Sequence, residues 1–162
     1  MSTCVFAGTF DPFTIGHLSA VKRLSAMFGC VIVAVADNAA KNPVLKAQQR
    51  LALVEKCCCK LKNVEIKVCE GLLSDFCLEF GANCIVKGVR NSADFDYENE
   101  MFKANLALSG IETLLLPSVP ELSFVSSSLI KELLGLDKDI SKLVPKEIHN
   151  DIAAGYSLKR KK

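Results

Sequence analysis

Residues 8–17 read Gly-Thr-Phe-Asp-Pro-Phe-Thr-Ile-Gly-His and connect an apolar stretch to the start of a helix through a turn of small and polar residues. A strand, a turn and a helix N-terminus in this order form an anion site from backbone N–H groups and the helix dipole. His17 falls in the first helical turn, where its ring can donate to a bound anion and Gly16 leaves room for it. The alternative is a histidine that only caps or packs the helix. Neither G-x-x-x-x-G-K nor G-x-G-x-x-G occurs here, which excludes a Walker-type site and an ordinary dinucleotide site.

Two other segments carry side chains suited to phosphate groups. Ser126, Ser127 and Ser128 precede an apolar helix, which one hydroxyl can cap while the other hydroxyls and the helix amides donate to phosphate oxygens. Simple capping is the alternative. Arg90 follows Gly88 at a predicted strand end, and a guanidinium fork suits phosphate oxygens, although a surface arginine would look the same.

The elements that must position these residues alternate along the chain. Apolar runs of strand length recur at 4–7, 31–36, 64–68, 84–86 and 113–116, and segments with helical apolar spacing cover 15–28, 47–61, 72–80, 93–108, 127–134 and 145–154. Strands that are apolar on both faces and separated by helices require a parallel sheet with both faces covered. We therefore predict an α/β fold: a doubly wound (Rossmann-like) five-stranded parallel sheet with C-terminal helices. Ligands of such sheets bind beyond the carboxyl ends of the strands, where the segments above lie.

Composition bounds the class of protein. The chain has 162 residues, half of them hydrophobic, which predicts one domain over residues 1–162. Its 20 basic residues exceed 18 acidic ones only because residues 159–162 are all basic, and we expect these four to form a frayed tail. The remaining 16 basic and 18 acidic residues form no broad cationic face, so we expect no nucleic-acid partner.

We expect neither a membrane span nor a secretory signal from this sequence. The longest uncharged stretch, residues 24–36, is 13 residues long, whereas a membrane span needs about 20. Asp11 would interrupt the apolar part of a secretory signal, and the first basic residue is Lys22. We expect a cytoplasmic protein with no membrane partner.

Eight cysteines are distributed over the chain, most of them in apolar periodic segments. A chain of this size needs no disulfide framework, so we predict buried free thiols. The run Cys57, Cys58 and Cys59 lacks C-x-x-C spacing and histidine partners, and we predict no protein-held metal site.

The segment G-T-F-D-P-x-T-x-G-H resembles the opening motif of the nucleotidyltransferases with an H/T-x-G-H element. It is most similar to that of the bacterial-type phosphopantetheine adenylyltransferase family. Three further segments fit that family in order and spacing: Lys41 with Pro43, Lys87-Gly-Val-Arg through Glu98, and Ser123-Phe-Val-Ser-Ser-Ser through Glu132. The resemblance covers nearly the whole chain.

The resemblance implies adenylyl transfer from ATP to 4′-phosphopantetheine, with dephospho-coenzyme A and pyrophosphate as products. It implies Mg²⁺ on the triphosphate and a homo-oligomer, commonly a hexamer. The implied catalytic residues are His17, Lys41 and Arg90, and the implied acceptor-binding residues are Thr9, Lys41, Leu73 and Lys87. The implied ATP contacts are Thr9, Phe10, His17, Gly88, Val89, Arg90, Glu98, Leu122, Ser123, Phe124, Val125, Ser126, Ser127 and Ser128. Asp94, Asp96 and Tyr97 lie at the start of the same helix as Glu98, where the helix dipole alone accounts for carboxylates.

Three positions depart from the family pattern. Lys87 replaces the usual arginine, Ile15 the common asparagine, and Leu122 the usual aromatic residue of the adenine pocket. Two alternatives stay open: an enzyme of the same superfamily with another acceptor, such as nicotinate mononucleotide or a sugar phosphate, and an ATP-binding module without turnover. A phosphate acceptor is largely ionised at neutral pH because its second pKa is about 6, so the implied reaction needs no strong general base.

Overall fold

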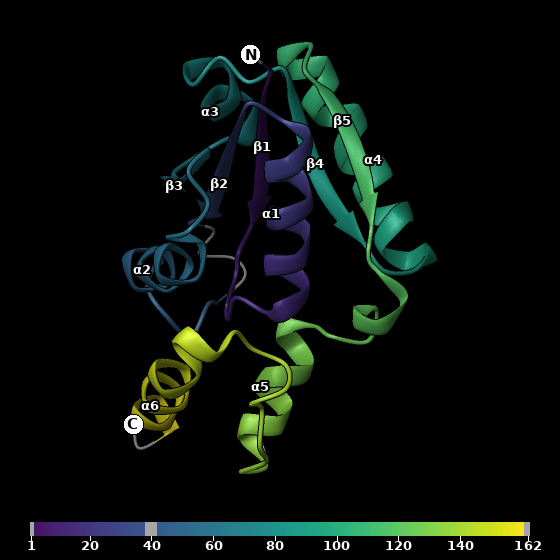
Figure 1. The fold of residues 1–162 in the computed structure, drawn as a ribbon. Coiled ribbons are helices and arrows are strands. Elements are labelled where there is room, and N and C mark those ends of the chain that lie inside the picture. Colours follow the sequence, from purple (N-terminus) through teal and green to yellow (C-terminus); the bar gives the residue numbers. More distant parts are fainter. Residues whose placement is uncertain (1, 38–41, 161–162) are drawn as a thin grey trace.

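Five parallel strands form the centre of the molecule, in the order β3-β2-β1-β4-β5 (Figure 1). The structure is a computed structural model that describes residues 2–37 and 42–160, with side chains described through residue 156. The strands are β1 (Thr3–Gly8), β2 (Cys30–Ala36), β3 (Val64–Cys69), β4 (Cys84–Val89) and β5 (Glu112–Pro117). The predicted doubly wound α/β fold is confirmed.

Helices cover both faces of this sheet. The helices α1 (Ile15–Met27) and α2 (Ala47–Cys58) pack on one face, and α3 (Leu73–Glu79) and α4 (Ser92–Ser109) on the other. The last two helices, α5 (Ser127–Gly135) and α6 (His149–Arg160), lie below the carboxyl ends of the strands in Figure 1. The site predicted at this edge therefore has two additional helices beside it.

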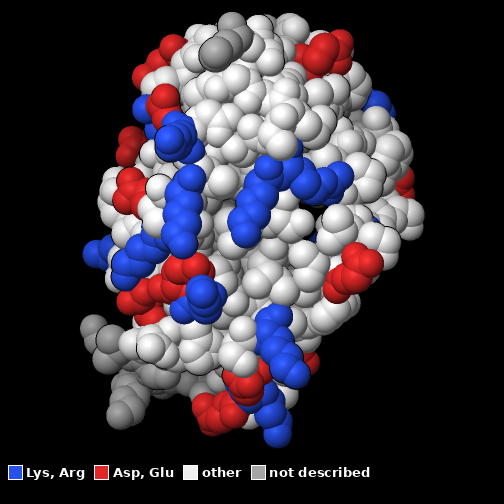
Figure 2. Space-filling view, viewed as in Figure 1, with Lys and Arg blue, Asp and Glu red and all other residues white. Residues whose placement is uncertain are grey.

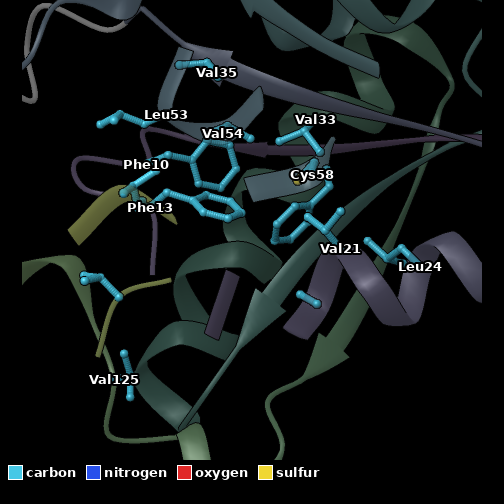
Figure 3. Packing of buried hydrophobic residues seen from close by; sticks show 14 of the residues in the cluster. Phe10, Phe13, Val21, Leu24, Val33, Val35, Leu53, Val54, Cys58 and Val125 are labelled. Carbon is cyan, nitrogen blue, oxygen red and sulfur yellow. The ribbon is translucent and has the colours of Figure 1, made fainter. Parts of the chain in front are cut away.

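Alternation along the strands explains why both faces are apolar. In β2, Val31, Val33 and Val35 belong to the larger core cluster under α1 and α2, whereas Ile32 and Ala34 face the smaller cluster with α3. The larger cluster extends into α5 and α6, and Figure 3 shows part of it, with the rings of Phe10 and Phe13 next to each other.

Three elements differ from the sequence prediction by three residues or more at a boundary. Strand β4 continues three residues beyond Val86, because residues 87–89 pair with residues 115–117 of β5. Helix α2 ends at Cys58, three residues early, where the N–H of Leu61 donates to the Cys58 carbonyl and Leu61 packs against the core. Helix α6 begins after a 3-10 turn at Lys146–Ile148 and runs to Arg160, beyond the predicted end at residue 154.

Candidate active site

A cleft opens between β1 and β4 at the carboxyl edge of the sheet. These strands pair only from Cys4 with Cys84 to Phe6 with Val86, after which β4 stays beside β5 while β1 leads into the turn before α1. Such a switch in strand order is where ligands of parallel sheets bind. The cleft has a volume of about 340 Å³ and is bordered by β1, α1, β4, α4 and the segment 116–128.

The turn between β1 and α1 is built around Phe10. This residue has a positive φ of 52° and is almost completely buried. Its ring lies so close to Gly8 that a Cβ there would approach ring carbons to 2.8 Å, which explains the glycine. The Phe10 ring also packs edge-on against His17, with ring centroids 5.0 Å apart, and against Phe13 at 5.4 Å. Phe10, an implied ATP contact, thus borders the cleft mainly as a support for His17.

Hydrogen bonds to Thr14 fix the tautomer of His17. Thr14 is the N-cap of α1: its Oγ1 accepts from the His17 backbone N–H at 3.2 Å, and its own N–H donates to His17 Nδ1 at 3.1 Å. This is a capping box in which the histidine takes the place of the usual Glu or Gln. Because Nδ1 accepts a backbone proton, the ring proton of the neutral imidazole is on Nε2. One histidine therefore serves both predicted roles: Nδ1 takes part in capping the helix, and Nε2–H is left as a donor.

Burial keeps this imidazole neutral. Burial and, as the smaller cause, the positive charge of Arg90 together lower the pKa of His17 from the usual 6.5 to about 4. At neutral pH the cleft thus contains an uncharged ring N–H donor whose other nitrogen is already bonded.

Arg90 borders the cleft with its guanidinium already engaged. Its Nε and Nη2 donate to the two carboxylate oxygens of Asp94 at 2.8 and 3.0 Å, and its backbone N–H donates to the same carboxylate at 3.0 Å. Nη1 lies 3.5 Å from the Val125 carbonyl. These hydrogen bonds raise the pKa of Arg90 and lower that of Asp94. Two of the fork's nitrogens are therefore held by Asp94, and Nη1 is directed toward the start of α5.

The three serines at the start of α5 have different partners. Ser126 is the N-cap, with Oγ accepting from Leu129 N–H at 3.0 Å. The Ser127 hydroxyl donates to the Pro12 carbonyl at 2.8 Å, which ties α5 to the turn. This hydroxyl is thus committed within the protein, where we expected a free donor. Ser128 has no side-chain hydrogen bond to the described residues, and all three serines line the cleft.

A second cavity continues from the cleft across β1 and β4. It contains the predicted acceptor residues Thr9, Leu73 and Lys87, and apolar side chains of α4 such as Met101 and Leu108. Both cavities share the same border at Ala7, Gly8, Lys87, Tyr97 and Glu98. An elongated ligand could therefore occupy one cavity and react in the other.

Lys87 and Glu98 form an ion pair at the junction of the two cavities. Lys87 Nζ lies 3.6 Å from Glu98 Oε2, and both side chains are largely buried. This Glu98 oxygen has no hydrogen bond to the described residues. A group that binds here has a cation within reach and a carboxylate beside it.

The remaining predicted residues are more dispersed. Leu122 and Val125 line the cleft, and Gly88 borders it from β4. Three predicted ATP contacts line neither cavity: Val89 at the end of β4, Ser123 and Phe124. The side chain of Phe124 is 63% exposed. Lys41 lies outside the described residues.

Sequence reasoning missed Asp11 and Arg50, which organise the site from within. Asp11 accepts from the backbone N–H groups of Val44 and Leu45. Arg50 is completely buried and donates to the carbonyls of Thr9, Ala36 and Leu45. An arginine on the apolar face of α2, three and four residues before Leu53 and Val54, was a signal that could have identified Arg50. Asp11 gave no comparable signal because its partners are distant in the chain.

The cysteines were also predicted to be free thiols. All eight cysteines are free, but burial was predicted too broadly: Cys59 is exposed and Cys30 and Cys57 are only partly buried, whereas the other five are buried. Burial raises the pKa of most of them, for example Cys58 to about 11. Among the residues that the structure describes, no three His, Cys, Asp or Glu side chains gather as a metal site.

Figure 2 shows basic and acidic side chains interspersed over one face. No helix in the described part of the chain is long and apolar enough to cross a membrane.

Comparisons with known proteins agree on one family. The cytidylyltransferase-like family model matches residues 5–133. The chain is 43% identical over 141 residues to the phosphopantetheine adenylyltransferase of Cutibacterium acnes, which covers 87% of this chain and 90% of that protein. It is 42% identical over 149 residues to the phosphopantetheine adenylyltransferase of Leuconostoc citreum, and the match covers 91% of this chain and 94% of that protein. It is 41% identical over 158 residues to the phosphopantetheine adenylyltransferase of Rubrobacter xylanophilus, and this match covers 97% of this chain and 96% of that protein.

The tautomer and the pKa of His17 can be measured directly. Because its pKa falls from the usual 6.5 to about 4, the native protein binds fewer protons than the unfolded chain between these values. The His17 contribution to stability is therefore lost as the pH falls from 6.5 toward 4. Long-range ¹H–¹⁵N NMR should show the Nε2–H tautomer at pH 7 and a midpoint near 4, with a His149→Gln variant to assign the two rings. A midpoint near 6.5, or a proton on Nδ1, would contradict the geometry.

Proposed function

This chain belongs to the phosphopantetheine adenylyltransferases of the cytidylyltransferase-like family, and we propose that its cleft and second cavity hold the two substrates of that reaction. The protein is an enzyme that transfers the adenylyl group of ATP to 4′-phosphopantetheine in coenzyme A synthesis. An oxygen of the acceptor phosphate bonds to the α-phosphorus as the bond to pyrophosphate breaks. The observation that carries the proposal is the hydrogen bond from Thr14 N–H to His17 Nδ1 at the switch point of the sheet, which leaves Nε2–H as the donor toward the cleft.

We place the triphosphate of ATP in the cleft. His17 donates from Nε2 to an α-phosphate oxygen and stabilises the charge that develops there in the transition state. Arg90, through Nη1, and the N-terminus of α5 with Ser128 bind the departing phosphates. Because the Ser127 hydroxyl is bonded to Pro12, Ser127 contributes its backbone N–H. Val125 and Leu122 border the adenine end.

The acceptor takes the second cavity in this proposal. The pantetheine arm, which is uncharged and partly apolar, matches a lining with Leu73, Met101 and Leu108. Its phosphate then lies at the junction, near Thr9 and Lys87, with the α-phosphorus of ATP on the other side. Holding the two phosphates in line is the main source of rate for a reaction whose nucleophile is already ionised. Lys41, outside the described residues, retains its proposed place on the acceptor phosphate.

We propose that Mg²⁺ enters with ATP. Asp94 and Glu98, which border the cleft, are ion-paired with Arg90 and Lys87, so phosphate oxygens and water are the better ligands, as Mg²⁺ commonly prefers. When bound, the ion neutralises charge on the triphosphate. The protein's own contribution is the set of donors from His17, Arg90 and α5.

We also propose a homo-oligomer, with a hexamer as the family resemblance implies. Exposed apolar side chains on α4 and β5 support it: Phe95 is 49% exposed, Leu108 63% and Leu114 48%. The eight free thiols support a location in the reducing cytoplasm.

Acceptor choice tests the proposed function. Pyrophosphate release from ATP and Mg²⁺ should depend on added 4′-phosphopantetheine and be absent with nicotinate mononucleotide or a sugar phosphate. Equal turnover with nicotinate mononucleotide would show that the enzyme uses another class of acceptor. Tight ATP binding without turnover on any acceptor would instead indicate a binding module.

Lys87 offers a test of the acceptor site. Lys87→Ala should weaken 4′-phosphopantetheine binding by on the order of tenfold, because it removes the cation and leaves the Glu98 carboxylate unpaired beside the acceptor phosphate. ATP affinity should change little. Lys87→Arg should tighten acceptor binding modestly, since a guanidinium presents paired donors.

The matched control for Lys87 is Lys103→Ala, which breaks an exposed Lys–Glu pair elsewhere on the chain. Calorimetric titration of each variant with both substrates separates the cases. Unchanged acceptor affinity in Lys87→Ala would mean that the acceptor phosphate lies elsewhere.

A further inference from the structure

Asp11, the acidic residue of Gly-Thr-Phe-Asp-Pro, has no role in the proposed reaction and yet is 3% exposed. Its Oδ2 accepts from Val44 N–H at 2.8 Å and lies 3.6 Å from Lys131 Nζ of α5. Its Oδ1 accepts from Leu45 N–H at 3.2 Å and from the Tyr156 hydroxyl at 2.7 Å. One buried carboxylate thus joins the β1–α1 turn to the 44–45 segment, to α5 and to α6.

Of the hydrogen bonds that the Asp11 carboxylate accepts, the one from the Tyr156 hydroxyl is the shortest. Tyr156 lies on α6, 145 residues from Asp11 in the chain, and its ring belongs to the main core cluster. Burial, together with Asp11, raises the pKa of this hydroxyl, so it remains a donor. A buried carboxylate is tolerated only when donors satisfy its oxygens. Without the hydroxyl, Oδ1 would keep only the longer bond from Leu45.

Other bonds hold the backbone of the same turn. The Ser127 hydroxyl binds the Pro12 carbonyl, Arg50 binds the Thr9 carbonyl, and the Ile15 N–H donates to the Leu143 carbonyl at 3.0 Å. Asp11 reaches α6 through its side chain, by the hydrogen bond from the Tyr156 hydroxyl. Thr9 and His17 flank the segment that these contacts immobilise.

We infer that Tyr156 is a positioning residue for adenylyl transfer: through Asp11, helix α6 holds the β1–α1 turn where Thr9 and His17 meet the reacting phosphates. This inference rests on the proposed function. Transition-state contacts are sensitive to shifts of a fraction of an ångström, whereas ground-state binding, spread over many contacts, is less so. Loss of the hydroxyl should therefore lower kcat more than it raises either KM.

The test is Tyr156→Phe, which keeps the ring in the core and removes one oxygen. Below the melting temperature of the variant, kcat should fall about five- to tenfold, with both KM values changed less than twofold. Hydrogen exchange of the Val44 and Leu45 amides, measured without substrates, should accelerate because their acceptor is less firmly held.

Asp151→Asn is the matched control. It weakens another attachment of α6, the exposed Lys56–Asp151 pair at 2.9 Å, and leaves Asp11 untouched. Its kcat and its Val44 and Leu45 exchange should match those of the parent protein. If Tyr156→Phe lowers only the melting temperature and keeps the parent kcat, Tyr156 is structural and the inference is wrong. Absence of turnover in the parent protein would overturn the proposed function instead, and unchanged amide exchange in Tyr156→Phe would then overturn the anchoring as well.

Discussion

The site depends on a turn between β1 and α1 that cannot hold its own shape. Phe10 has a positive φ, an unfavourable conformation for a residue with a bulky side chain, and Asp11 is a carboxylate removed from water. Both are tolerated because distant segments satisfy the turn: Arg50 from α2, Ser127 from α5 and Tyr156 from α6. The C-terminal helices are therefore part of what shapes the catalytic edge of the sheet.

The same turn determines the chemistry of His17. With Nδ1 bonded to the Thr14 N–H and the ring packed against Phe10, the side chain has one orientation, one tautomer and one remaining donor. A lowered pKa means that this donor is neutral at physiological pH. Such a donor stabilises charge on an α-phosphate without losing a proton, which fits a reaction whose nucleophile arrives ionised. The acceptor and the leaving group then need only charge and position, and Lys87, Arg90 and α5 can supply both.

Sequence patterns predicted the sheet well because burial on both faces leaves few alternatives for apolar runs separated by helices. They were less accurate where pairing outweighed composition, as at Lys87 and Gly88, which continue β4 beside β5. The motif residues His17, Arg90 and Ser126–Ser128 were found because each lies at a strand end or helix start, and the structure brings them to one cleft. Their partners were harder to predict. The bond from Tyr156 to Asp11 spans 145 residues, and the occupation of the Ser127 hydroxyl by Pro12 depends on how α5 docks, which no local pattern encodes.

In the proposed reaction His17 acts on the transition state from a position fixed by the β1–α1 turn. The most direct measurement is the single-turnover rate of adenylyl transfer in His17→Ala at saturating substrates, beside the calorimetric Kd for ATP. The single-turnover rate should fall by on the order of a hundredfold or more, while the Kd for ATP stays within about twofold of the parent value. A rate that survives while ATP binding collapses would contradict it and make His17 a ground-state ligand.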